Sequence, residues 1–184
     1  MRKNDKFLVF KLLTFFFVLN SYSQQMTPNK VDPLIVESIK ETIWIPFMES
    51  YRELDVTKLV SLYANELTRV SLDLNKIENK SEFSESMRSF FERMRTMNLQ
   101  MDIRFSIVST ATSNDKVYQT GYYSFGLRKN KDEPYRISGY SRFDVLLVKD
   151  KSNGSWSIVL DSDKRENLTE EEFLDSGMLY KLEQ

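Results

Sequence analysis

The sequence contains neither cysteine nor histidine. Without cysteine there are no disulfides, so the fold depends on its hydrophobic core in an oxidising or a reducing compartment alike. Without histidine, every catalytic relay or metal site that needs an imidazole is excluded. A transition-metal site would have to use carboxylates alone, which is an uncommon ligand set for such metals. The five glycines are scattered and form no loop that could cradle a phosphate. We therefore expect no metal and no cofactor.

Clusters of basic residues are also missing. The chain has 26 basic and 27 acidic residues, and removal of residues 1–23 takes away four basic and one acidic residue, which leaves a net charge of −4. A mildly acidic domain without a basic patch is a poor partner for nucleic acid or for an anionic membrane. We expect neither as a partner.

The N-terminus has the pattern of a cleaved secretory signal peptide. Basic residues precede an apolar core from Leu12 to Leu19, and small residues follow at Ser21 and Ser23. The apolar run is too short to span a bilayer. The pattern predicts a signal peptide over residues 1–23, with cleavage near Ser23/Gln24, and therefore a secreted or periplasmic protein without a membrane anchor. A polar, disordered lead-in is expected over residues 24–32.

Apolar residues at spacings of three and four then predict helices. The first should run from Pro33 to about Leu54, with a kink or a new start near Ile45 because Pro46 lies inside it. A second is expected over 56–65, with Asp55 as its N-cap. A third should follow Ser81 as its N-cap, and its stripe of phenylalanine and methionine is typical of core packing.

From Leu99 the apolar period changes to two, which indicates strands. Long strands are expected over 99–107, 117–127, 135–148 and 156–160, after a short one at 68–72. Asn153-Gly154 is a hairpin signal, and successive hairpins imply an antiparallel meander. Helices that precede such a sheet give an α+β domain, which we place at residues 33–163.

The remaining segment, residues 164–184, is expected to be a short amphipathic helix and tail. Thr169 and Glu172 form a capping box, and Gly177 should weaken the helix in its middle. The segment either docks on the domain or frays in solvent.

The second and third long strands are apolar or aromatic on both faces. A sheet that is covered by helices on one side alone should alternate more cleanly. A two-fold partner on the outer face would explain the pattern, and a strongly curved sheet whose ends are wrapped by its own loops would explain it equally well.

Three stretches resemble a known superfamily: FMESYRELDVTKLVSLYANELTRVS at 47–71, VYQTGYYSF at 117–125 and GYSRFDVLLVKDKSNGSWSIVLDSD at 139–163. They look like the nuclear-transport-factor-2-like superfamily, in particular its SnoaL-like (polyketide-cyclase-like) branch. The resemblance implies a cone-shaped roll, in which three N-terminal helices pack on a curved, mainly antiparallel sheet above a pocket. Members include isomerases, cyclases, dehydratases and transport adaptors, so the fold does not select a function.

The resemblance argues against the isomerase mechanism of some members. Their oxyanion-stabilising tyrosine falls on Phe47, which cannot donate a hydrogen bond. Their aspartate base falls near Ser71, with Asp73 two residues further along. Asp73, Asp144 and Tyr51 remain as candidate catalytic acid–base groups.

Arg142 and Asp144 are two residues apart on one strand and therefore share a face. The resemblance places that face inside the cone, where a buried pair of opposite charges could bind a polar or anionic ligand. A structural ion pair at the rim is the plainer interpretation, and an inverted register would put both residues in solvent. The candidate pocket residues are Phe47, Tyr51, Phe91, Gln119, Tyr123, Tyr140, Arg142 and Asp144.

Asp161, Asp163 and Glu172 have the spacing of ligand positions one, three and twelve of an EF-hand calcium loop. Arg165 at the fifth position and Glu166 at the sixth, where glycine is needed, argue against calcium.

We expect a secreted or periplasmic protein that binds a small, partly apolar molecule without catalysis. A homodimeric interaction module, formed through the outer sheet face, is the first alternative. An isomerase, cyclase or dehydratase that uses carboxylate and tyrosine acid–base chemistry is the second.

Overall fold

The computed structural model describes residues 31–183. The signal peptide predicted for residues 1–23, and nearly all of the lead-in predicted for 24–32, lie outside the described residues. Between residues 31 and 183, no helix is long and apolar enough to cross a membrane.

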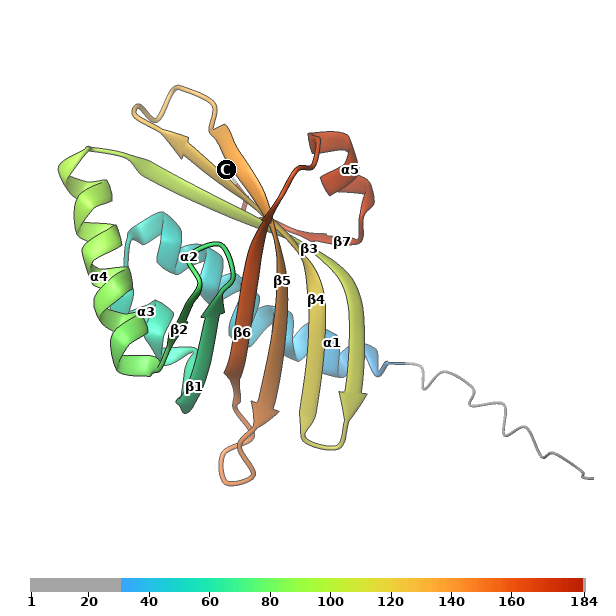
Figure 1. Cartoon of the computed structure of the whole chain (residues 1–184). Coiled ribbons are helices and arrows are strands. Elements are labelled where there is room, and N and C mark those ends of the chain that lie inside the picture. The colour runs from blue at the N-terminus through green and yellow to red at the C-terminus, as the bar shows by residue number, and fades with distance from the viewer. Residues whose placement is uncertain (1–30, 184) are drawn as a thin grey trace, which may run out of the picture. The chain divides into compact units, whose positions relative to one another are not determined.

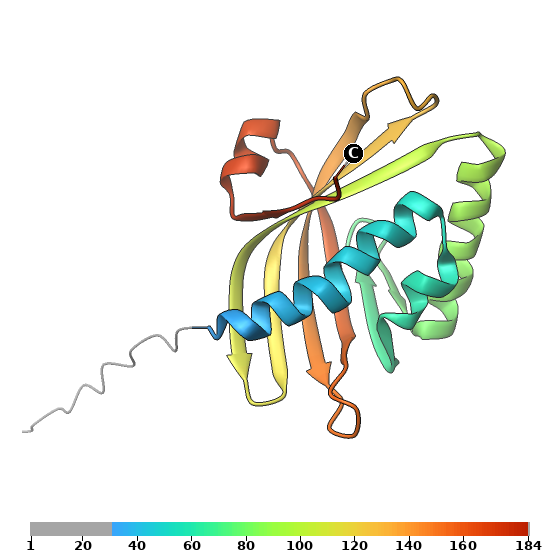
Figure 2. The ribbon, with the colours of Figure 1, turned by 180° about the vertical axis from the view of Figure 1, so that it is seen from behind.

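The chain opens with a long helical rod made of α1 (Pro33–Ile39), the π-helical turn η1 (Lys40–Trp44) and α2 (Ile45–Glu53), which lies across the sheet in Figure 2. Asp32 caps α1, since its side chain accepts a hydrogen bond from the Leu34 amide at 2.9 Å. Pro46 lacks the N–H that would donate a hydrogen bond to the preceding turn, and its ring would clash with the backbone of a regular α-helix. The wider π-helical turn relieves this clash. The disturbance predicted near Ile45 is confirmed.

Two further helices flank this rod. Asp55 caps α3 (Val56–Ser61) as predicted, but the helix is shorter than expected because the chain enters strand β1 (Tyr63–Ser71) directly afterwards. Helix α4 (Lys80–Thr96) begins two residues earlier than predicted. Its cap is Asn79 rather than Ser81, because Asn79 and Glu82 form a reciprocal capping box.

One sheet of seven strands holds the domain together, in the order β2-β1-β6-β5-β4-β3-β7. The meander of four long strands is confirmed, and three of these strands are longer than predicted: β3 (Gln100–Ser113), β4 (Lys116–Arg128), β5 (Arg136–Lys149) and β6 (Trp156–Glu166). The short β2 (Lys76–Glu78) pairs with β1, which in turn runs parallel to β6. All other neighbours are antiparallel, so the α+β roll with a mainly antiparallel sheet is confirmed (Figure 1).

The C-terminal segment docks on the sheet. Thr169 and Glu172 form the predicted capping box of α5 (Glu170–Asp175), and β7 (Met178–Tyr180) pairs with β3. The prediction that Gly177 lies within the helix is wrong, because the helix ends before it. A Cβ on Gly177 would lie 2.2 Å from the Ile107 carbonyl oxygen, so glycine is required where the chain crosses β3.

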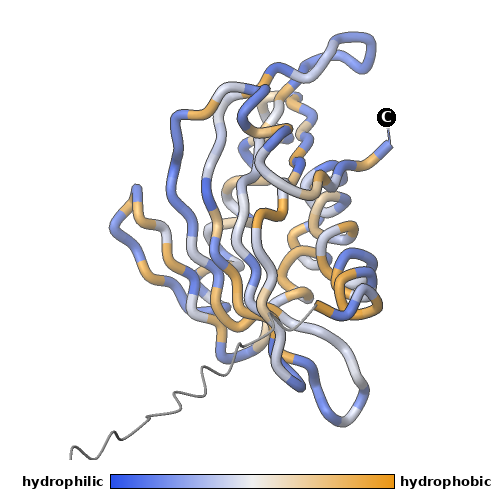
Figure 3. Tube along the Cα trace, turned by 90° about the vertical axis from the view of Figure 1, so that its right-hand side faces the viewer, coloured by the Kyte–Doolittle hydropathy of each residue, from blue (hydrophilic) through white to orange (hydrophobic). Residues whose placement is uncertain are grey.

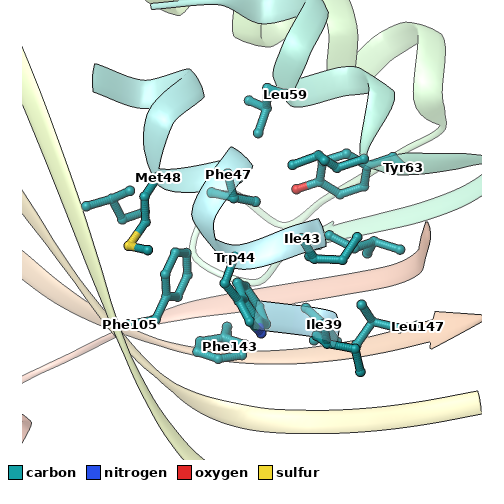
Figure 4. Packing of buried hydrophobic residues seen from close by; sticks show 14 of the residues in the cluster. Ile39, Ile43, Trp44, Phe47, Met48, Leu59, Tyr63, Phe105, Phe143 and Leu147 are labelled. Carbon is teal, nitrogen blue, oxygen red and sulfur yellow. The ribbon is translucent and has the colours of Figure 1, made fainter. Parts of the chain in front are cut away.

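The core lies between the helical rod and the inner, concave face of the sheet. Figure 3 shows hydrophobic segments in both the sheet and the helices. Trp44 is central: its ring centroid lies 4.6 Å from that of Phe105 and 5.3 Å from that of Phe143 (Figure 4). The phenylalanine and methionine stripe of α4 is buried in the same core, as predicted.

The outer face of the sheet is covered in part. Phe173 of α5 is fully buried, and its ring lies 5.3 Å from that of Tyr140. Tyr118, farther along the same face, is 40% exposed. The chain therefore wraps one end of its own outer face, as the second interpretation of the two-faced strands expected, and leaves the other end open.

Candidate functional site

A pocket lies between α2, α4 and the inner face of the sheet. It consists of an enclosed inner chamber of about 70 Å³ and an open outer chamber of about 580 Å³. Both chambers share Tyr51, Ile103, Tyr123 and Asp163 as lining residues, so they meet at one junction. The outer chamber alone has the size of a small-molecule site, which is roughly 300–1,000 Å³.

An arginine and two aspartates lie at this junction. Arg69 is opposite Asp161 in the parallel register of β1 and β6, which brings their side chains together. The Arg69 guanidinium lies 3.4 Å from Asp161 Oδ2 and 2.8 Å from Asp163 Oδ2. The three side chains are only 11% to 15% exposed, so this is a nearly buried ionic cluster.

Burial dominates the electrostatics of the cluster. It raises the pKa of the Asp161 carboxyl above its ordinary value, although Arg69 and the Tyr63 hydroxyl oppose the rise. Burial alone would lower the pKa of the Arg69 guanidinium, but Asp161 and Asp163 together raise it. Arg69 therefore stays charged, and its charge is already balanced by protein carboxylates.

Two tyrosines complete the cluster. The Tyr63 hydroxyl donates to Asp161 Oδ2 at 2.8 Å, and the Tyr123 hydroxyl donates to Asp163 Oδ2 at 2.7 Å. Tyr123 is on β4 and Asp163 is on β6, so their hydrogen bond spans β5. Ser141, the β5 residue that pairs with Tyr123, is small and leaves room for this bridge.

Tyr51 enters the junction from α2. Its ring stacks on that of Phe47, with centroids 5.3 Å apart and an interplanar angle of 9°. Burial is the main cause that raises the pKa of the Tyr51 hydroxyl, so the hydroxyl is neutral and can donate or accept a hydrogen bond. Among residues 31–183, no protein atom hydrogen-bonds to Asp163 Oδ1, which is buried.

The charged residues that line the two chambers are three carboxylates and two guanidinium groups: Asp73, Asp161, Asp163, Arg69 and Arg165. With all of them ionised, the pocket carries one excess negative charge.

Four predicted pocket residues line the chambers. Phe47 lies in the inner chamber and Tyr51 and Tyr123 line both, whereas Tyr140 borders the outer chamber although its ring packs against Phe173 on the outer face of the sheet. Two others lie in the core beside the pocket. The Phe91 ring packs edge-on against Tyr51, and Gln119 accepts a hydrogen bond from Trp44 Nε1 at 2.9 Å.

The predicted orientation of Arg142 and Asp144 is wrong. Arg142 is 54% exposed, and both residues lie on the outer face, where Asp144 accepts hydrogen bonds from Arg142 and from the Tyr118 hydroxyl. The inner face of β5 carries Phe143, Val145 and Leu147 instead. Burial of these side chains removes more apolar surface from water than burial of the opposite face, which includes Arg142 and Asp144, would.

Asp73, a candidate acid–base group, lies at the rim of the outer chamber. It is exposed, and its Oδ2 accepts a hydrogen bond from the Arg165 amide at 2.6 Å. This contact ties the loop after β1 to β6, so the carboxylate has a structural partner.

Sequence reasoning missed Arg69, Tyr63, Asp161 and Asp163 as site residues. The strand predicted from 156 ends too early, at Leu160, and the two aspartates beyond it fit a calcium-loop spacing instead. Their separation by two residues was the available signal, since it puts both on one face of a longer strand. Within residues 31–183 no three carboxylates gather as a metal site, and Glu172 instead accepts a hydrogen bond from the Thr169 amide.

No protein-family model and no curated protein matches the sequence. Solved structures match the fold. Aln2 from a Streptomyces species aligns with a TM-score of 0.61 at 10% identity, over 73% of this chain and 92% of its own. A ketosteroid isomerase-like protein from Erwinia carotovora atroseptica aligns with a TM-score of 0.56 at 15% identity, over 74% and 100%.

An NTF-2 like protein of unknown function from Shewanella oneidensis aligns with a TM-score of 0.52 at 18% identity, over 70% of this chain and 98% of its own. Such low identities establish the fold alone. The chain has the fold of these structures, one of which is described as NTF-2 like, as the resemblance of the sequence implied.

Proposed function

We propose that this protein binds a small, partly apolar molecule in the two-chamber pocket, without catalysing a reaction. The observation that carries the proposal is the junction of the chambers. There, a mainly aromatic cavity meets the Tyr51 hydroxyl and the carboxylate of Asp163. Ligand sites commonly combine such an apolar wall with a few convergent polar groups.

The polar groups favour binding over acid–base chemistry. The hydroxyls of Tyr63 and Tyr123 each donate to a carboxylate, and those carboxylates are held by Arg69. A general acid or base has to exchange its proton with the substrate. An isomerase, cyclase or dehydratase would have to rely on Tyr51, whose raised pKa makes it a poor base near neutral pH.

Native mass spectrometry of the protein purified from its own host tests the proposal. We expect an adduct that is lost on denaturation and whose mass identifies the ligand class. Ser141→Phe would place an aromatic ring in the outer chamber beside the junction, where it blocks the polar groups, and should abolish the adduct. Thr120→Phe introduces the same side chain on the outer face of the neighbouring strand and should retain it. Equal loss in both variants, or a bare wild-type protein that also fails to bind apolar probes, would overturn the proposal.

A homodimer through the outer sheet face is a second proposal. The open end of that face combines Tyr118 with a positive and a negative side chain, Arg142 and Asp144, so a second copy offers complementary charges. Sedimentation equilibrium should give twice the chain mass, and Tyr118→Lys should give the monomer. A wild-type monomer at high concentration would reject it.

We also propose an exported location, because residues 1–23 have the signal pattern. Sequencing of the mature N-terminus in the native host should begin near Gln24, and a chain that begins at Met1 inside the cell would contradict this.

A further inference from the structure

We propose that the pocket selects molecules in which an apolar body carries a protonated amine. This inference rests on the proposed binding function and adds the chemistry of the ligand's polar end. The two chambers place that end at their junction, beside Asp163 and Tyr51.

The arginine at the junction has little capacity left for an anionic ligand. Its Nε faces Asp161 at 3.4 Å, one terminal nitrogen faces Asp163 at 2.8 Å, and the other donates to the Val70 carbonyl at 2.8 Å. A carboxylate or phosphate would therefore have to displace a protein partner from Arg69. Arg165, at the mouth, is exposed and donates one side-chain hydrogen bond, to the Ser138 carbonyl at 3.0 Å, so any attraction it has for an anion acts in solvent and is weak.

The acceptor side of the junction is incomplete. Asp163 Oδ2 receives hydrogen bonds from Tyr123 and Arg69, but Oδ1 receives none within residues 31–183, although it is buried. A buried acceptor without a donor destabilises the folded protein. A ligand that donates a hydrogen bond to this carboxylate removes that cost, whereas a ligand with only acceptors cannot.

Net charge and aromatic walls select an amine from among the possible donors. With all five charged lining residues ionised, the pocket has one excess negative charge, which a cation neutralises and a hydroxyl does not. The stacked rings of Phe47 and Tyr51, with Phe90 and Phe125 at the outer chamber, present aromatic surfaces to which cations are attracted.

Three probes with one carbon skeleton test the inference: 2-(1-naphthyl)ethylamine, 2-(1-naphthyl)ethanol and 1-naphthylacetate. Binding is measured by isothermal titration calorimetry at neutral pH on the delipidated protein. We expect the amine to bind at least about tenfold more tightly than the alcohol, as a charge-assisted hydrogen bond predicts, and the acetate most weakly.

Asp163→Asn removes the charge and keeps the shape of the side chain. It should reduce the preference for the amine over the alcohol by about tenfold. Asp144→Asn is the matched control, since Asp144 also accepts from a tyrosine and an arginine but lies on the outer face. It should leave the preference unchanged. If Asp163→Asn does not fold, the affinities of the three probes for wild type and for Tyr51→Phe still test the inference.

The outcomes separate the two proposals. If the acetate or the alcohol binds best and Ser141→Phe abolishes that binding, the amine inference is wrong and the pocket still binds ligands. If none of the three probes binds and no native adduct is found, both proposals fail. An amine preference that persists in Ser141→Phe would place the binding outside the pocket and would also overturn the inference.

Discussion

Asp163 and Asp144 have the same kinds of partner on opposite faces of the sheet. Each accepts a hydrogen bond from a tyrosine and forms an ion pair with an arginine, and Asp144 is opposite Ser162, the residue next to Asp163. The Asp163 cluster is nearly buried, whereas the arginine partner of Asp144 is half exposed. Burial therefore separates two otherwise similar sites.

This difference predicts unequal effects on stability. Asp163→Asn leaves Arg69 with weaker compensation in a buried place and should lower the free energy of unfolding by about 2–4 kcal/mol. Asp144→Asn breaks a surface pair and should cost less than about 1 kcal/mol. Urea unfolding followed by circular dichroism measures both. Equal losses would mean that the Asp163 cluster is as solvated as the outer pair.

The pH dependence of stability should change in Asp161→Asn. Because burial raises the pKa of Asp161, the folded protein holds this proton more tightly than the unfolded chain does. The contribution of Asp161 to stability is therefore complete below the ordinary carboxyl pKa of 3.8 and is lost as the pH rises through the raised pKa. The stability of wild type minus that of the variant should fall with rising pH.

Asp150→Asn supplies a control of opposite sign. Hydrogen bonds from the Ser152 hydroxyl and backbone lower the pKa of Asp150, so its contribution is present above the ordinary value and is lost as the pH falls. The difference from wild type should rise with pH here. Urea titrations from about pH 3 to about pH 7 cover both slopes, because the slope of Asp150 lies below its ordinary pKa of 3.8 and that of Asp161 lies above it. Parallel slopes would contradict the assignment of Asp161 as the carboxyl with the raised pKa.

The start of α4 gives a third prediction. Asn79→Ala removes the side chain that accepts from the Glu82 amide and should destabilise the protein by about 1 kcal/mol. Ser81→Ala, within the first helical turn, should change the midpoint of thermal unfolding little. A larger loss of stability in Ser81→Ala than in Asn79→Ala would mean that Ser81 is the N-cap of α4.

Gly177 gives a fourth prediction. A methyl group at this position would lie so near the Ile107 carbonyl that Gly177→Ala should cost about 1–3 kcal/mol by overpacking and should weaken the docking of β7. Hydrogen exchange at the amides of β7 reports the docking. Met178→Ala, which shortens an exposed side chain in β7, should leave that exchange near wild type.

The sequence predicted the helices and strands well where the apolar residues follow a single spacing, that of a helix or that of a strand. The Asp55 cap, the disturbance near Ile45 and the capping box of Thr169 follow from local rules of helix chemistry, and all are confirmed. Helix ends were less certain, because both Asn79 and Ser81 are good N-cap residues and only the fold selects one.

The site was predicted in part. Tyr51 and Tyr123, which lie on strongly patterned elements, both line the two chambers. The inner face of β5 was assigned wrongly, because both faces of that strand carry apolar residues and its period cannot select one. Arg69 depends on a parallel pairing with β6, which brings together residues that are distant along the chain. Local patterns do not encode such a pairing.

The π-helical turn at Lys40–Trp44 has a consequence for natural variation. It gives the rod one more residue than a uniform α-helix of the same length would have. Deletion of one residue within this turn would leave a uniform α-helix, and Phe47 and Tyr51 would keep their positions relative to α1. Relatives that share this pocket should therefore have one of two residue counts between Ile39 and Tyr51: the present count with the wide turn, or one residue fewer without it.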